Sequence, residues 1–221
     1  MDFPQFDILA VSSALLLVTT FGVVVRQGFL DWLSAYRYQA IALSAVTAII
    51  AYVTGIWEIY IAAALTLAIK AIIIPKVLTF VTQKIKLEVK IEENPYVSLR
   101  LSVLISAVLV ALSYFLVLEI PIKSDPVVAA YLPLSISLFL IGLFIMVIRR
   151  MALNQVVGLL IIENGLFLFA TALTHGTSLI IEIGIFVDIL VGVIISAILL
   201  VRISHTFDTL DIGKLESLKD S

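Results

Sequence analysis

Long runs of apolar residues recur along the whole chain. Of its 221 residues, 62% are hydrophobic and 14% are charged, whereas a typical soluble domain is about 25% charged. An α-helix rises 1.5 Å per residue, so about 20 apolar residues cross the hydrocarbon core of a bilayer. A soluble fold of this length could not cover so much apolar surface. The sequence therefore predicts an all-α, multi-pass membrane protein.

Seven runs are candidates for membrane-spanning helices. They lie at residues 8–25, 38–53, 57–80, 97–118, 127–148, 153–173 and 179–201. The second run is the shortest, and its boundaries are the hardest to define. The last two form a pair joined by a short turn at His175–Ser178. We divide the chain into a four-helix region (1–126), a three-helix region (127–203) and a polar tail (204–221).

Lysine and arginine are distributed unequally between the two sides of these spans. Alternate connections carry eleven basic residues, and the opposite side carries only Lys123. The eleven are Arg26, Arg37, Lys84, Lys86, Lys90, Arg100, Arg149, Arg150, Arg202, Lys214 and Lys219. Basic connections stay in the cytoplasm, so we expect the N-terminus outside, the C-terminus and tail inside, and location in the cytoplasmic (inner) membrane. The acidic N-terminus has no basic region of the kind that precedes a cleavable signal peptide, so we expect the first helix to be retained.

Three ionisable side chains fall inside predicted spans: Lys70 in the third, Glu163 in the sixth and Asp188 in the seventh. A charge at the bilayer centre costs roughly 2.5–3.5 kcal/mol on insertion scales, so such residues usually have a partner or a function. Each lies 13 or 14 residues, about 20 Å, from a basic residue at the cytoplasmic end of its span. The sequence therefore predicts that all three lie at one depth, near the midplane.

Two carboxylates and an ammonium at one depth are suited to proton transfer. Burial favours the neutral form of each group, and an opposite charge nearby favours the charged form. Movement of a neighbouring charge could therefore load or empty each site. The alternative is that Lys70, Glu163 and Asp188 form structural ion pairs within the chain or with neighbouring subunits. Glu182, near the outer end of the seventh span, is either a group for proton uptake or an interfacial charge.

Other polar and small residues have more ordinary interpretations. Asn164 could form a hydrogen bond across a helix interface, and Pro75 is expected to kink or loosen the third span. Glycines within the spans indicate close helix packing. The chain has no cysteine, and its two histidines lie away from clustered carboxylates. We therefore expect no metal site, no bound cofactor, no catalytic residue and no nucleic-acid partner.

The whole chain resembles component E of hydrogenase 4, a membrane subunit of group 4 energy-converting hydrogenases and formate hydrogenlyase complexes, and the resemblance is most specific in four segments. They read LAIKAIIIPKVLTF, GLLIIENGLF, EIGIFVDILVGVII and TLDIGKLESLK. The last three spans, about residues 135–203, also resemble the small 4L or K subunit of respiratory complex I and its cation/proton antiporter relative, through VIRR and DILVG.

The resemblance implies a role in a proton-translocating membrane arm, through acidic residues of the last two helices. Asp188 matches one acidic position of the family. At the other position this chain has Leu160, and Glu163 lies one turn further on, about 5 Å away. The four additional N-terminal spans, with Lys70, fit the hydrogenase-type subunit.

We therefore predict a non-catalytic subunit that conducts or couples protons. Its partners would be antiporter-like membrane subunits and a hydrogenase or dehydrogenase arm, whose chains would carry out the redox chemistry. Three alternatives remain open at this point: a structural adaptor without a proton role, a subunit of a relative that moves sodium, and a free-standing transporter or channel. The electron donor and acceptor of the parent complex are not specified by the sequence.

Overall fold

The protein is a multi-pass helical membrane protein. Its structure, a computed structural model, describes residues 3–84, 96–118, 125–149, 152–174 and 192. All regular structure within these ranges is helical, and six of the described helical segments are long and apolar enough to span a membrane. Apart from Gly192, the seventh predicted span, the turn before it and the polar tail lie outside the described residues, as do Glu182 and Asp188.

The six spans follow one another in sequence order. They are α1 (Phe3–Val24), α2 (Phe29–Thr54), a third span made of α3 (Glu58–Thr66), the π-helical turn η1 (Leu67–Ile73) and α4 (Ile74–Lys84), then α5 (Leu99–Leu118), α6 (Pro126–Ile148) and α7 (Ala152–Thr174).

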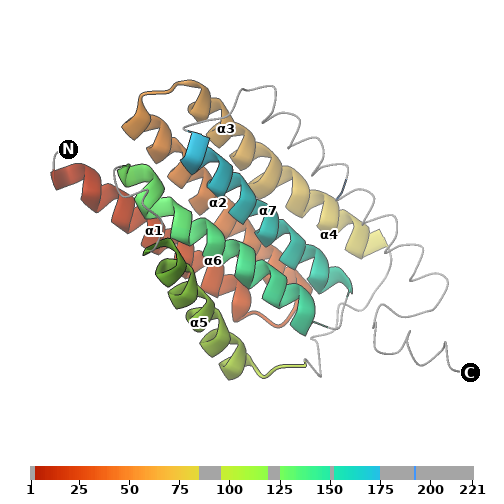
Figure 1. The fold of residues 1–221 in the computed structure, drawn as a ribbon. Coiled ribbons are helices and arrows are strands. Elements are labelled where there is room, and N and C mark those ends of the chain that lie inside the picture. The colour runs from red at the N-terminus through yellow and green to blue at the C-terminus, as the bar shows by residue number, and fades with distance from the viewer. Residues whose placement is uncertain (1–2, 85–95, 119–124, 150–151, 175–191, 193–221) are drawn as a thin grey trace, which may run out of the picture.

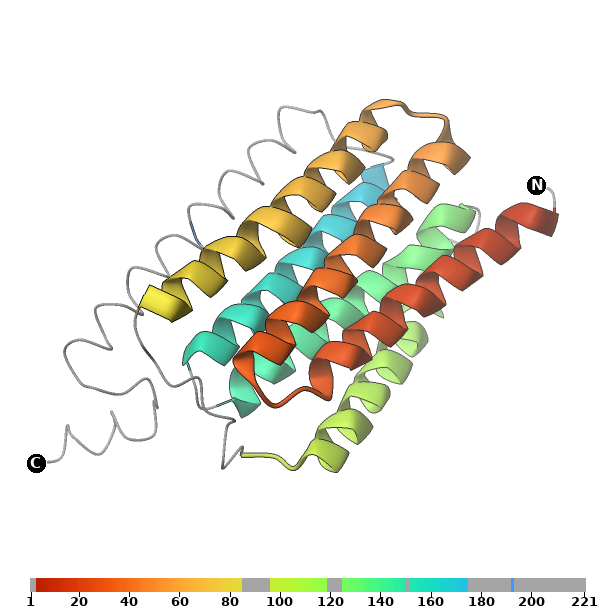
Figure 2. The same cartoon turned by 180° about the vertical axis from the view of Figure 1, so that it is seen from behind.

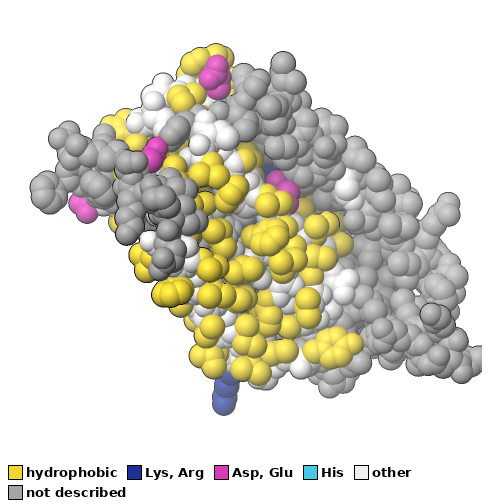
Figure 3. All heavy atoms as spheres, viewed as in Figure 1, with side chains coloured by type: hydrophobic (Ala, Val, Ile, Leu, Met, Phe, Trp, Pro, Cys, Tyr) yellow, Lys and Arg dark blue, Asp and Glu magenta, His cyan; other side chains and the backbone are white. Residues whose placement is uncertain are grey.

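Helix α2 occupies the centre of the bundle. It contacts α1, α7 and all three parts of the third span, while α6 packs along α7 and α1. Helix α5 contacts α6 and α1 and lies at one edge of the bundle (Figures 1 and 2). On the face seen in Figure 3, the described side chains are mainly hydrophobic and few of them are charged. This surface is appropriate for contact with lipid or with other membrane helices.

Glycines allow α6 and α7 to approach each other closely, as the sequence predicted. A Cβ atom on Gly142 would lie 2.7 Å from the backbone nitrogen of Ile162. A Cβ atom on Gly165 would lie 2.8 Å from the backbone nitrogen of Phe139 and from the carbonyl oxygen of Ser135. These glycines fix the position of α7, and with it the position of the acidic residue that α7 carries.

The predicted start of the second span was wrong. The helix begins at Phe29 and not at residue 38, so Arg37 lies inside α2 and not in a connection. Polar residues lowered the hydropathy of this stretch, but they are accommodated within the bundle. Gln39 is fully buried and hydrogen-bonded to other helices, and Arg37 donates a hydrogen bond to the third span.

Candidate functional site

The third span is not a regular α-helix at its centre. Pro75 has no N–H to donate to the carbonyl of Ala71, and its ring would collide with that carbonyl in an α-helix. The helix widens into the π-helical turn η1 just before the proline, and the N–H of Ile74 donates to the carbonyl of Ile69, five residues earlier. Pro75 was predicted to loosen this span, and the π-helical turn is the form that the loosening takes. Such turns are frequent at functional sites.

Arg37 donates a hydrogen bond to the carbonyl of Ala71, to which Pro75 cannot donate. Its Nε lies 3.0 Å from the carbonyl oxygen of Ala71. Ala71 is 13 residues from Glu58 and 13 from Lys84, the two ends of the third span. This hydrogen bond therefore lies about 20 Å from either end, near the middle of the membrane. Sequence analysis missed this role because it placed Arg37 in a connection.

Lys70 and Glu163 form an ion pair between the π-helical turn and α7. Lys70 Nζ donates to Glu163 Oε1 over 2.7 Å. The lysine side chain is fully buried, and that of the glutamate is 15% exposed. The ammonium also lies over the ring of Phe167, 4.5 Å from its centroid, a distance at which a cation is attracted to an aromatic face. The prediction that Lys70 and Glu163 share one depth is confirmed.

The second oxygen of this carboxylate has unused hydrogen-bonding capacity. Glu163 Oε2 is buried and accepts no hydrogen bond from any described residue. A buried oxygen without a donor costs about 1–3 kcal/mol, and more when it is charged. A proton or a hydrogen-bonded water would therefore be stabilised at Glu163 Oε2.

A chain of hydrogen bonds begins at the residue next to Glu163 and crosses the bundle. Asn164 Nδ2 donates to Gln39 Oε1 over 3.3 Å, and Gln39 Nε2 donates to Thr20 Oγ1 over 2.9 Å. Thr20 donates in turn to the carbonyl of Leu16 over 2.8 Å. The prediction of a cross-helix hydrogen bond from Asn164 is confirmed. With the ion pair, these bonds form a polar layer that joins α1, α2, η1 and α7.

The proton between the two groups of the ion pair can reside on Lys70 or on Glu163. At 2.7 Å, a proton can pass from Lys70 Nζ to Glu163 Oε1 within one hydrogen bond. The pair then changes from ammonium and carboxylate to amine and carboxylic acid. Because low dielectric disfavours isolated charge, an additional cation nearby would shift the balance between these states. The arrangement is therefore chemically able to move a proton between Lys70 and Glu163.

The C-terminal part of the chain matches a known protein family. Residues 130–220 match the family model of NADH-ubiquinone/plastoquinone oxidoreductase chain 4L. The matched stretch contains Glu163 together with Glu182 and Asp188, whereas Lys70 lies outside it. The resemblance of the C-terminal part to the small complex I subunit is thus confirmed, and this part is similar to a membrane subunit of a complex I-related oxidoreductase.

A curated relative matches a shorter stretch. An uncharacterized protein, Rv0085, of Mycobacterium tuberculosis (strain ATCC 25618 / H37Rv) is 38% identical over 78 residues, which cover 35% of this chain and 36% of that protein. The match thus spans about a third of the relative's length. No solved structure matches the chain.

Proposed function

We propose that this chain is a membrane-arm subunit of an energy-converting, complex I-related oxidoreductase, of the hydrogenase 4 component E type, and that it contributes to proton translocation. One observation carries the proposal: a buried ammonium and a carboxylate are in direct contact halfway along two membrane spans. The match of residues 130–220 to chain 4L supports the kind of complex.

Glu163 is the proposed proton carrier, and Lys70 is the group that controls its charge. Oε1 receives the hydrogen bond from Lys70, and Oε2, which accepts no hydrogen bond from the described residues, can take a proton from another donor. When positive charge from a neighbouring subunit comes nearer to Lys70 than to Glu163, the ammonium is disfavoured and passes its proton to the carboxylate, which leaves a neutral amine and a carboxylic acid. Asp188, predicted at the same depth, is the proposed next carrier, and Glu182 is the proposed group for proton uptake near the outer surface.

Antiporter-like membrane subunits and a hydrogenase or dehydrogenase arm are the proposed partners. Redox chemistry would take place in that arm, and this chain would couple it to proton movement in the cytoplasmic membrane. The match to chain 4L and the largely apolar face seen in Figure 3 support a position within a membrane arm.

The experiment compares Glu163→Gln with the wild type in sealed membrane vesicles that contain the assembled complex. Glutamine keeps the size of the side chain and removes the titrating group. We expect normal amounts of complex and electron transfer with reduced proton pumping. Asp31→Asn, an exposed change in the first turn of α2, is the control and should pump normally. Wild-type pumping by Glu163→Gln would refute the proton role.

The same vesicles separate the alternatives. A structural adaptor would lose assembled complex in Glu163→Gln before any loss of coupling. A sodium-moving complex would stop ion transport when sodium is omitted and would tolerate a protonophore. A free-standing transporter would move ions after purification of this chain alone into liposomes. None of these outcomes is expected for the proposed subunit.

A further inference from the structure

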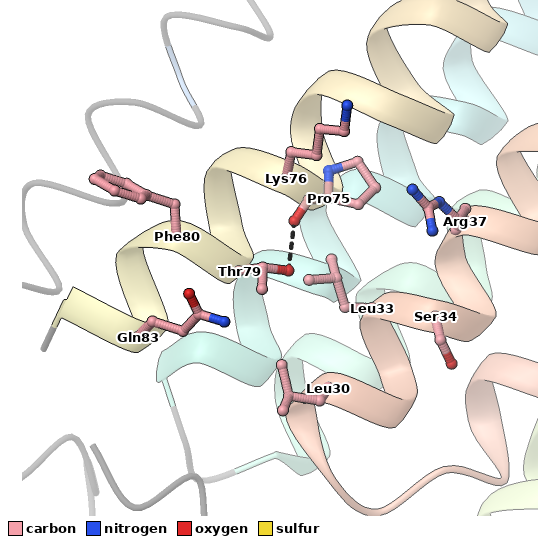
Figure 4. A pocket seen from close by; sticks show the side chains of 9 residues that line it. All are labelled: Leu30, Leu33, Ser34, Arg37, Pro75, Lys76, Thr79, Phe80 and Gln83. Atoms are coloured by element: carbon pink, nitrogen blue, oxygen red, sulfur yellow. Dashed lines mark hydrogen bonds between the residues drawn. The ribbon is translucent and has the colours of Figure 1, made fainter. Parts of the chain in front are cut away.

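A groove of about 310 Å³ lies between the first half of α2 and α4. Figure 4 shows Arg37 and Lys76 on either side of Pro75 at one end of this groove, and Leu30, Phe80 and Gln83 toward the other. Both basic side chains are exposed. The proposed proton site does not use this groove, because neither Lys70 nor Glu163 lines it.

An exposed cation at the depth of Arg37 is costly unless something negative covers it. A charge that faces hydrocarbon costs roughly 2.5–3.5 kcal/mol. Among the described residues, neither Arg37 nor Lys76 contacts a carboxylate. Arg37 uses Nε for the carbonyl of Ala71, so its two Nη groups retain the fork of donors that suits a carboxylate. The charge of the groove therefore indicates an anionic occupant.

The depth of Arg37 decides between two kinds of anion. Its Nε is held at the carbonyl of Ala71, halfway along the third span. Lipid phosphates lie outside the hydrocarbon core, which is about 30 Å thick, so a phosphate would have to descend well into the core to reach this guanidinium. A carboxylate on a membrane-spanning helix can lie at any depth. Lys76, five residues nearer the end of the span, can direct its ammonium toward the interface.

We propose that this groove receives a transmembrane helix of a partner subunit, and that an aspartate or glutamate on that helix pairs with Arg37. Leu30, Leu33 and Phe80 offer the apolar walls that such a helix would pack against. The proposal depends on the chain being a subunit of a larger membrane complex. It adds the surface that binds a neighbour and the chemistry that this neighbour must have.

The first test is photo-crosslinking from the groove in the assembled complex, in native membranes. A photoreactive amino acid replaces Ser34, an exposed residue that lines the groove, and mass spectrometry identifies the crosslinked peptide. We expect a transmembrane segment of another subunit that contains an aspartate or a glutamate. A crosslink to phospholipid, to another part of this chain, or to a segment without an acidic residue would overturn the proposal.

Two variants separate the charge of Arg37 from its hydrogen bond. Arg37→Gln places an amide nitrogen at the same number of bonds from the backbone as Nε, so it can still donate to Ala71 while the charge is removed. Arg37→Met removes both. We expect Arg37→Gln to lower the crosslinking yield about tenfold or more, with the thermal stability of the purified chain unchanged. An unchanged yield in Arg37→Gln would contradict the proposed pairing.

A charge reversal completes the design. Arg37→Glu should abolish the crosslink, and changing the crosslinked partner's acidic residue to arginine should restore it. Glu163→Gln should stop pumping and leave the crosslink intact, because the groove and the ion pair are separate sites. The docking proposal and the proton proposal can therefore fail independently.

Discussion

The energetic coupling between Lys70 and Glu163 can be measured with a double-mutant cycle of Lys70→Met, Glu163→Gln and the double variant. At 2.7 Å the two charges attract each other by ~6 kcal/mol at an effective dielectric constant of 20. Desolvation offsets much of this, and removing one member of a buried pair typically costs about 3–5 kcal/mol because a charge remains buried. We expect each single variant of the isolated chain to lose about that much unfolding free energy, while in the assembled complex the partner subunits stabilise the folded chain and compensate for the loss.

The double variant should lose much less than the sum of the two single losses, because neither charge remains in the bundle. Unfolding free energies of the purified chain, from titration with a denaturing detergent, give the coupling directly. We expect a coupling of about 3 kcal/mol, at the upper end of the range for residues in contact. Additive losses, to within about 0.5 kcal/mol, would refute the inference that the two charges stabilise each other.

Three further changes test the elements that position the site. Pro75→Ala supplies the N–H that an α-helix would donate to Ala71, so the π-helical turn should tighten and rotate Lys70 away from Glu163. We expect a normally folded chain that no longer pumps protons, and full pumping would contradict this. Gln39→Leu removes both cross-helix hydrogen bonds of that side chain and should cost about 1–3 kcal/mol of unfolding free energy, whereas an unchanged denaturation midpoint would show that these bonds contribute nothing. Gly165→Ala should destabilise the chain by about 1–3 kcal/mol, since its Cβ would lie 2.8 Å from backbone atoms of α6; Gly22→Ala, which meets nothing within 4 Å, is the matched control and should not.

Much of the fold follows from the sequence, because hydrophobic thickness fixes the length of each span. Five of the six described spans lie close to their predicted limits. The shared depth of Lys70 and Glu163 was predicted from their distances to the basic ends of their spans, and an ion pair within the chain was one of the alternatives left open. The cross-helix hydrogen bond of Asn164 was predicted because a polar side chain inside a membrane span needs a hydrogen-bond partner.

Other features depend on contacts between helices, which the amino-acid sequence alone does not show. The start of α2 was misplaced because Arg37 and Gln39 lowered the local hydropathy, and only the positions of their partners show that they fit inside a bundle. From the sequence, Pro75 predicted a kink or loosening of the third span but not a π-helical turn. Its widening, and the donor from Arg37, depend on the neighbouring helix. Asp188 remains a sequence prediction.

The most direct test of the account is infrared difference spectroscopy of the assembled complex during turnover, comparing the wild type with Glu163→Gln. The account predicts a carboxylic acid C=O band that appears and disappears with turnover in the wild type and is missing from the variant. A band that persists unchanged in Glu163→Gln, or a wild-type complex that pumps without such a band, would contradict the claim that Glu163 carries the proton.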